Sequence, residues 1–378
     1  MKRLSIAIYY QNNLRSVFIE SLVLELNKCN DVYLYTTCDK GEIHFFLESH
    51  GVETFSVKPL DLKKKFPVEY IYQGYKLHRF CRKKKIEVVF SHLQLSNLVA
   101  TIYSRISGVI VIPCRHHIDA SFLSKSSNAK IQDKIVNHFS RKQVVVSKQA
   151  KDFMVRAESA NPSKIEYIPL GYNFSLYPVP DSKKVALLKL KFPHKYRVIM
   201  ISRHIVSKRH DLGIKLVKKL LDQGLDIGLI ILDSGPSTSA LMDLAFKLEI
   251  SKNVYFEGYQ TNVINYLATC HLLLLPSIQE SSNQVVKEAS LLGIPSFVCT
   301  DVGDFNDYMQ HKKNCFMVDR DSFVETGSKL LIEMFSRKEW EESLSYLGKN
   351  AKNDILKLFK IEAVSKKYLN LIENFNEG

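Results

Sequence analysis

The chain has 378 residues, of which 46% are hydrophobic and 24% are charged. This length suits two domains of ordinary size, and the composition excludes a largely disordered chain. The formal net charge of +14 indicates a surface that attracts polyanions such as anionic lipid head groups or phosphorylated ligands. Some of this charge is clustered at residues 63–65 and 82–85, and a merely solvated surface is an equally good explanation of such clusters.

The seven cysteines are widely spaced and form no C-x-x-C pair. This pattern predicts reduced and mostly buried thiols, and it argues against a disulfide framework or a zinc site. The first apolar run turns polar at Gln11, which is too early for the core of a signal peptide. No window offers the roughly 20 apolar residues that a spanning helix needs, so we expect a cytoplasmic protein.

Short apolar runs alternate with longer amphipathic stretches through the first half of the chain. The runs are almost continuously apolar, which predicts strands buried on both faces of a parallel sheet. Ser147 is expected to cap the helix that follows the fifth run. Strands are predicted at residues 4–9, 32–35, 88–91, 109–112, 144–147 and 165–168, and helices at 16–26, 70–83 and 129–139.

Two adjacent histidines, His116 and His117, follow the strand predicted at residues 109–112. Ligands of open parallel sheets bind at the carboxyl ends of the strands, where an imidazole can hydrogen-bond them. The sequence alone does not distinguish the two histidines, and we favour His117, with Asp119 as a carboxylate that would orient an imidazole. A loop pair without a role is the alternative.

Prolines at 178 and 180 interrupt the pattern and place a domain boundary near them. The second half then repeats the alternation of strands and helices, which is typical of a doubly wound α/β domain. We predict domains at residues 1–178 and 179–360, with a terminal helix at 361–378 that packs back on the first. Second-half strands are expected at 198–201, 227–232, 254–256, 272–275 and 297–298, and helices at 212–221 and 241–248.

Glu280 and Glu288 lie in a strand–loop–helix segment that Gly293 and Pro295 bring to an end. Free N–H groups at the helix start, at Ser282, Asn283 and Gln284, can cradle a diphosphate. Glu288 would then accept hydrogen bonds from ribose hydroxyls, and Glu280 from a hydroxyl on the far side of the phosphates. Two glutamates at this spacing are common by chance, but this structural context makes the signal strong.

Arg203 and Lys208 follow the first strand of the second domain. Preorganised cations stabilise the charge that develops on a departing diphosphate. The alternative is that both are surface residues of a basic protein.

Several motifs resemble glycosyltransferase family 4. The segment 276–295 resembles its E-x(7)-E element in the frame P-S-x-x-E…E-A…G-x-P. The segments 201–211, 232–236 and 254–259 resemble its G-R-x…K stretch, its G-x-G-P turn and its V-x-F-x-G strand, in the same order. Residues 167–173 resemble the I-P-N-G-V-D exit from the first domain, and the segment 111–119 a strand-end histidine motif.

The resemblance implies a retaining enzyme of the GT-B type: an α/β protein with two Rossmann-like doubly wound domains that face each other across a cleft. The first domain would bind the acceptor and the second a nucleotide-sugar donor. No metal or other cofactor is expected. The implied roles are catalytic for His117, His116 and Glu280, diphosphate-binding for Arg203, Lys208, Ser282, Asn283 and Gln284, ribose-binding for Glu288, and proximity to the base for Gly258 and Tyr259.

The resemblance further implies a UDP- or GDP-sugar donor and a glycan or polyprenyl-linked acceptor. Bacterial cell-surface polysaccharide assembly (O-antigen, capsule or lipopolysaccharide) is the usual setting. The basic segment from Lys63 to Lys85 adds the hypothesis of peripheral contact with anionic lipid on the inner face of the plasma membrane; nucleic acid is not an expected partner. The alternatives are a GT-B nucleotide-sugar epimerase and a non-enzymatic basic module that binds membrane or nucleic acid. A further alternative, an NAD-dependent oxidoreductase on a similar sheet, needs a G-x-G-x-x-G string after a strand, and no such string occurs.

Overall fold

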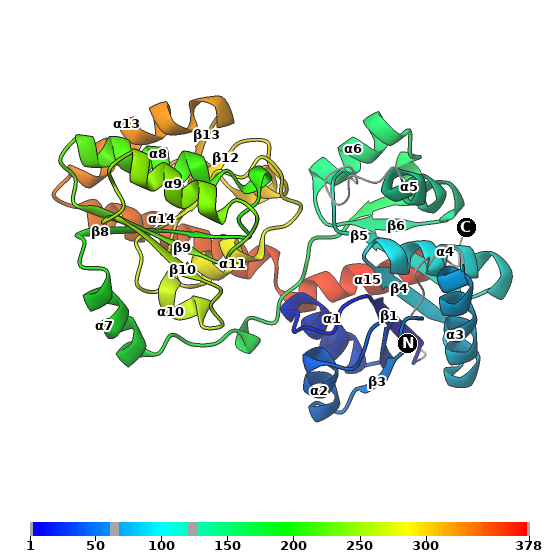
Figure 1. Cartoon of the computed structure of the whole chain (residues 1–378). Coiled ribbons are helices and arrows are strands. Elements are labelled where there is room, and N and C mark those ends of the chain that lie inside the picture. Colours follow the sequence, from blue (N-terminus) through cyan, green and yellow to red (C-terminus); the bar gives the residue numbers. More distant parts are fainter. Residues whose placement is uncertain (1–2, 61–67, 120–127, 376–378) are drawn as a thin grey trace. The chain divides into compact units, whose positions relative to one another are not determined.

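A computed structural model describes residues 3–60, 68–119 and 128–375 of the chain. The chain divides into two compact units, shown in Figure 1. Unit 1 consists of Met1–Tyr177 and Phe359–Gly378, and unit 2 of Pro178–Leu358. The division between Tyr177 and Pro178 is one residue from the boundary placed between residues 178 and 179.

Unit 1 contains a seven-stranded parallel sheet with the order β3-β2-β1-β4-β5-β6-β7. Six of its strands were predicted, and β3 was missed because its sequence Glu-Thr-Phe-Ser holds a single apolar residue. The strands are β1 (Ser5–Tyr10), β2 (Asp31–Thr36), β3 (Glu53–Ser56), β4 (Val88–His92), β5 (Ile110–Arg115), β6 (Gln143–Val145) and β7 (Ile165–Tyr167).

Helices cover both faces of this sheet because alternate residues of each strand point to opposite faces. Ile6 and Ile8 of β1 pack with α1, α2 and α15, while Ala7 and Tyr9 pack with α3 and α4. Ser147 caps α6 as predicted, its side chain accepting a hydrogen bond from the backbone of Ala150. The helices are α1 (Val17–Asn27), α2 (Glu42–Ser49), α3 (Val68–Lys84), α4 (Gln94–Ser107), α5 (Asn128–Phe139), α6 (Lys148–Glu158) and α15 (Ile361–Phe375).

The C-terminal helix α15 is part of the core of unit 1. Val364, Tyr368 and Ile372 are buried in the same cluster as the residues of β1 and α1. The ring of Tyr368 lies edge-on to that of Phe90 in β4, with 5.0 Å between centroids. The chain therefore leaves unit 1, forms unit 2 and returns.

Unit 2 contains a six-stranded sheet with the order β10-β9-β8-β11-β12-β13, again parallel throughout. Five strands were predicted, whereas the three-residue β13 was not. The strands are β8 (Tyr196–Ile201), β9 (Ile227–Leu232), β10 (Val254–Gly258), β11 (Leu272–Leu275), β12 (Ser296–Cys299) and β13 (Phe316–Val318).

One helix of unit 2, α7, was not predicted because it begins directly after the prolines of the domain boundary. Extended backbone runs through Pro178 and Pro180 and ends at Asp181, whose carboxylate caps α7 by accepting from the amides of Lys183 and Lys184. The helices are α7 (Ser182–Lys191), α8 (His210–Asp222), α9 (Thr238–Lys247), α10 (Val263–Leu267), α11 (Gln284–Leu291), α12 (Phe305–Tyr308), α13 (Phe323–Phe335) and α14 (Trp340–Leu358).

Within the described ranges, no helix combines the length and the apolar character that crossing a bilayer requires.

Candidate active site

The strand order of unit 2 reverses between β8 and β11, which are neighbours in the sheet. In open parallel sheets such a reversal opens a crevice at the carboxyl ends of the two strands, where ligands bind. The loop after β8 carries Arg203 and Lys208, and the loop after β11 carries Glu280. The amide of Ile278 donates to the carbonyl of Ser207 over 2.9 Å, so the two loops are joined directly.

Lys208 and Glu280, 72 residues apart, meet at this point. The ammonium Nζ of Lys208 lies 2.6 Å from Oε1 of Glu280, and the two side chains are 19% and 8% exposed. Removal of either partner would leave a largely buried charge without its counter-ion, which is costly. The sequence-predicted cation and carboxylate thus form one unit of the site.

Arg203 lies in the same loop as Lys208 but is exposed. Its guanidinium forms no hydrogen bond or ion pair with any residue in the described part of the chain. An unpaired guanidinium keeps its fork of donors available for an incoming anion. Diphosphate binding by Arg203 stays a prediction.

Glu280 is also held from a third loop, the one that follows β12. Gly303 has a left-handed φ of +63° there, and a Cβ atom on it would lie 2.9 Å from the backbone and from Cβ of Glu280. No side chain fits at this distance without displacing the glutamate. Gly303 therefore sets how closely the two loops approach.

Gly303→Ala is expected to lower the free energy of unfolding by more than the 1–2 kcal/mol, roughly, that a left-handed backbone costs a residue with a Cβ. Gly224→Ala is the matched control, because Gly224 has a φ of +77° and a Cβ atom on it would meet nothing within 4 Å. Urea unfolding of the full chain compares the two variants. Equal losses would contradict the close packing of Gly303 on Glu280.

The start of α11, where diphosphate binding was predicted, uses its side chains internally. Asn283 caps the helix by accepting from the amide of Val286 over 3.0 Å. Ser282 donates to Asp304 over 2.7 Å, and Gln284 donates to Glu288 over 2.9 Å. The backbone amides of the first turn lack intrahelical acceptors in any helix, so an anion would bind through them.

Glu288 lies one turn into α11 and is half-buried. Burial raises the pKa of its carboxyl, and the hydrogen bond from Gln284 opposes that shift. A carboxylate held by one amide donor retains further acceptor positions. Ribose binding at Glu288 stays a prediction.

Sequence reasoning missed a buried ion pair directly behind this helix start. Nζ of Lys287 lies 2.5 Å from Oδ2 of Asp304, and both side chains have 0% exposure. Lys287 also donates to Oγ of Ser282 over 3.0 Å. Burial lowers the pKa of the lysine and raises that of the aspartate, while their attraction opposes both shifts. Asn283 and Ser290 share the helix face of Lys287, so no local signal in the sequence indicates that this lysine is buried.

Gly258 and Tyr259, predicted to lie near the base, are the last residue of β10 and the residue after it, at the same end of the sheet. Gly258 has a φ of +67° and its carbonyl accepts from the amide of Asp233 over 2.7 Å. The ring of Tyr259 is largely exposed. An exposed ring can stack on a flat ligand, and this role stays a prediction.

In unit 1, His117 is buried and its Nε2 donates to Asp133 of α5 over 2.6 Å. Arg115 ties the same region together through Glu158, at 2.6 Å, and through the carbonyl of His117, at 3.0 Å. Asp133, rather than Asp119, is the carboxylate that orients this imidazole. One nitrogen of His117, which we favoured, is therefore already occupied.

His116 is half-buried and its Nε2 lies 2.9 Å from Nδ1 of His92 at the end of β4. The ring of Phe18 packs on it with 5.2 Å between centroids. Burial and the neighbouring His117 lower the pKa of His116 to about 3, and burial also lowers that of His92. Both imidazoles are thus neutral at pH 7 and serve as hydrogen-bonding groups.

This pair predicts acid sensitivity. The folded-state pKa of His116, about 3, lies below the usual 6.5, so below pH 6.5 the unfolded chain binds more protons and stability falls as the pH falls. In urea unfolding between pH 7.5 and pH 5, His116→Phe is expected to lose less stability than the parent. His50→Gln, at an exposed histidine, is the control, and an unchanged slope in His116→Phe would contradict the expectation.

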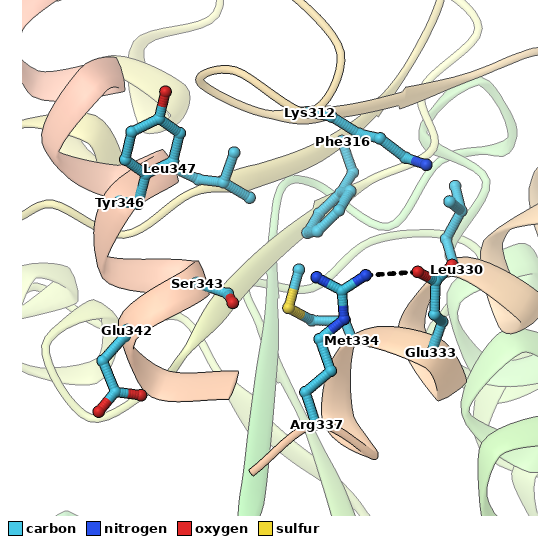
Figure 2. Close-up of a pocket in the computed structure, with 10 residues that line it drawn as sticks. All are labelled: Lys312, Phe316, Leu330, Glu333, Met334, Arg337, Glu342, Ser343, Tyr346 and Leu347. Atoms are coloured by element: carbon cyan, nitrogen blue, oxygen red, sulfur yellow. Dashed lines mark hydrogen bonds and ion pairs between the residues drawn. The ribbon is translucent and has the colours of Figure 1, made fainter. Parts of the chain in front are cut away.

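A separate cavity of about 400 Å³ in unit 2 holds none of the predicted site residues. Figure 2 shows that Lys312 and Phe316 lie across it from Met334 and Arg337, with Arg337 paired to Glu333. In the part of the chain that the structure describes, no three His, Cys, Asp or Glu side chains are grouped to hold a metal ion. The candidate site is therefore taken to be the loops at the switch point, where Lys208 and Glu280 meet.

Comparisons with known proteins identify chains that resemble this one. Residues 187–354 match the family described as Glycosyl transferases group 1. The chain is 21% identical over 321 residues to an Escherichia coli UDP-Gal:α-D-GlcNAc-diphosphoundecaprenol α-1,3-galactosyltransferase, with 79% of each chain covered. It is 28% identical over 174 residues to N-acetyl-α-D-glucosaminyl L-malate synthase of Bacillus anthracis, covering 45% of this chain and 43% of that one.

The solved structure of Anabaena HepE with UDP-glucose has the same fold, with a TM-score of 0.82 and 15% identity over 98% of this chain and 100% of that chain. Two parallel α/β units of this kind define the GT-B fold, and the chain is a glycosyltransferase. The residues that match the group 1 glycosyl transferases, 187–354, all lie in unit 2.

Proposed function

We propose that the protein transfers a sugar from a UDP-sugar to a lipid-linked or glycan acceptor, with retention at the anomeric carbon. The observation that carries the proposal is the Lys208–Glu280 pair at the switch point of unit 2, beside the start of α11. It is the arrangement that a nucleoside diphosphate sugar requires: cations for the phosphates and a carboxylate for the sugar hydroxyls.

In the proposed reaction, the bond between the anomeric carbon and the diphosphate oxygen breaks and the acceptor hydroxyl oxygen bonds to that carbon. The hydroxyl proton passes to the departing phosphate, which leaves as UDP. Lys208, Arg203 and the amides of the α11 start bind the growing negative charge. Because charge increases on the leaving group, these contacts are stronger in the transition state than in the bound donor.

The remaining predicted residues take supporting roles in this proposal. Glu280 accepts hydrogen bonds from the sugar and Glu288 from the ribose, while Gly258 and Tyr259 lie near the base. Nε2 is occupied in both histidines, by Asp133 for His117 and by His92 for His116, so either one would contact the sugar or the acceptor through its Nδ1. A neutral His116 can donate or accept without an ion-pairing partner.

The acceptor class is proposed from similarity, since the E. coli relative acts on a diphosphoundecaprenol-linked sugar. A polyprenyl-linked acceptor in bacterial cell-surface polysaccharide assembly, at the inner face of the plasma membrane, would follow. The basic segment from Lys63 to Lys85 would then contact anionic lipid. Residues 61–67 of that segment lie outside the described residues, so α3 carries what can be argued.

Thermal unfolding of the full chain with a panel of nucleotides tests the donor site. UDP at a hundredfold excess over its dissociation constant is expected to stabilise the fold by about 2.7 kcal/mol, with GDP and ADP weaker. Lys208→Gln is expected to reduce the UDP effect.

Lys218→Gln is the matched control, because that half-buried lysine pairs with Asp222 on α8, away from the candidate site. If no nucleotide raises the unfolding temperature, the donor proposal is wrong. If UDP-glucose is converted to its epimer without an acceptor, the protein is an epimerase and the proposed transfer is wrong.

A further inference from the structure

An apolar groove of about 450 Å³ lies between α3 and α4 of unit 1, outside the candidate active site. Ile71, Gly74 and Tyr75 of α3 line one side, and Ile102, Tyr103 and Ile106 of α4 line the other. Figure 1 shows both helices at the outside of unit 1. The groove is open where Gly74 has no side chain: a Cβ there would meet nothing within 4 Å.

The rim of this groove is formed by apolar side chains that are exposed to solvent. Ile71 is 70% exposed and Ile106 is 84% exposed, and Tyr75 and Ile102 are exposed beside them. These residues recur on α3 and α4 at spacings of four, so they form two facing stripes. Contiguous exposed apolar surface of this kind marks a binding site.

Cations adjoin the α3 stripe, where the guanidinium of Arg79 lies 6.0 Å from the ring centroid of Tyr75, and exposed acids are absent from both helices. Arg79, Arg82 and Lys83 of α3 and Arg105 of α4 are exposed and form no ion pair with the described residues. The single acidic residue of α3 and α4 is Glu69, which is buried. The surface therefore combines an apolar channel with uncompensated positive charge.

We propose that this α3–α4 groove seats a hydrocarbon chain of an anionic membrane lipid, whose head group the flanking arginines bind. Charge complementarity selects this occupant, because an anionic amphiphile matches both parts of the surface. A second copy of this chain would bring the same cations together. The inference rests on the proposed function, because an enzyme whose acceptor lies in the membrane must reach the membrane surface.

Vesicle binding by the purified full chain tests the groove. The parent is expected to bind phosphatidylglycerol vesicles and to be photolabelled on α3 and α4 by phosphatidylglycerol that carries a diazirine in its acyl chain. Gly74→Leu adds a side chain at the open position, where a Cβ atom meets nothing within 4 Å, and the labelling and the partition coefficient are expected to fall about tenfold. Ile71→Ser/Ile106→Ser is expected to give a similar loss, which added salt does not reverse.

Ala157→Leu is the matched control, since it adds the same side chain at an exposed position of α6. Labelling outside α3 and α4, or full binding by Gly74→Leu, would overturn the proposal. So would a parent that dimerises through these isoleucines and ignores vesicles. The UDP stabilisation measured without lipid reports on unit 2 alone, so failure of the donor site and failure of the groove are separable.

Discussion

Lys287→Met is expected to lower the free energy of unfolding by about 3–5 kcal/mol, the largest stability loss we predict. The substitution keeps the length of the side chain but leaves the carboxylate of Asp304 fully buried without its counter-ion. Oδ1 of Asp304 already lacks a partner among the described residues, and Oδ2 would keep the hydroxyl of Ser282 alone. Urea unfolding of the full chain measures the loss.

The double variant Lys287→Met/Asp304→Leu separates the ion pair from simple loss of packing. With both charges removed, no buried charge remains, and apolar replacements of buried ion pairs are often neutral or stabilising. We therefore expect the double variant to recover most of the stability that the single variant loses. If it is no more stable than Lys287→Met, the cost lies in the fit of the methionine and not in the orphaned carboxylate.

The strands were predictable because the chemistry that forms them is local. Runs such as Leu272–Leu275 are apolar throughout, and burial on both faces of a parallel sheet demands that pattern. Strand β3 was missed because Glu-Thr-Phe-Ser holds a single apolar residue, and β13, Phe-Met-Val, because a run of three residues is too short to indicate a strand. Their place is set by the neighbouring strands.

The site was predictable to the extent that its chemistry follows strand ends. The carboxyl ends of β8 and β11 bring Lys208 and Glu280 together although 72 residues separate them, and the parallel order alone implies this. No local pattern could pair Lys287 with Asp304, because the partner comes from the loop after β12. For the same reason Asp133 replaced Asp119 beside His117.

The electrostatic environment of the two histidines also could not be predicted from the sequence. His116 and His117 are adjacent in the chain, yet one pairs with His92 and the other with Asp133. Successive residues at a strand end point in opposite directions, so each meets a different set of neighbours. Only the packed structure shows that the pKa of His116 is lowered to about 3.

Lys208→Gln is expected to lower kcat/KM for donor turnover by about 10²–10³, as removal of one preorganised donor to a developing negative charge does. The side chain is partly buried, so its charge acts in a medium that screens it less than water does. UDP release from UDP-glucose, with and without acceptor, measures turnover. Lys218→Gln, which changes an exposed ion pair on α8, should leave it unaltered.

Glu280→Gln probes the other half of the pair and distinguishes a positioning role from a binding one. Glutamine keeps the shape and an acceptor oxygen but removes the charge that holds Lys208 at 2.6 Å. If Glu280 chiefly orients the lysine, the double variant Lys208→Gln/Glu280→Gln should be no slower than Lys208→Gln alone. If Glu280 also binds a sugar hydroxyl, the double variant should be slower than Lys208→Gln alone, because a second donor contact is lost. The two losses are not expected to multiply fully, since residues joined in one ion pair are coupled. Full turnover by both single variants would place the chemistry away from the switch point of unit 2.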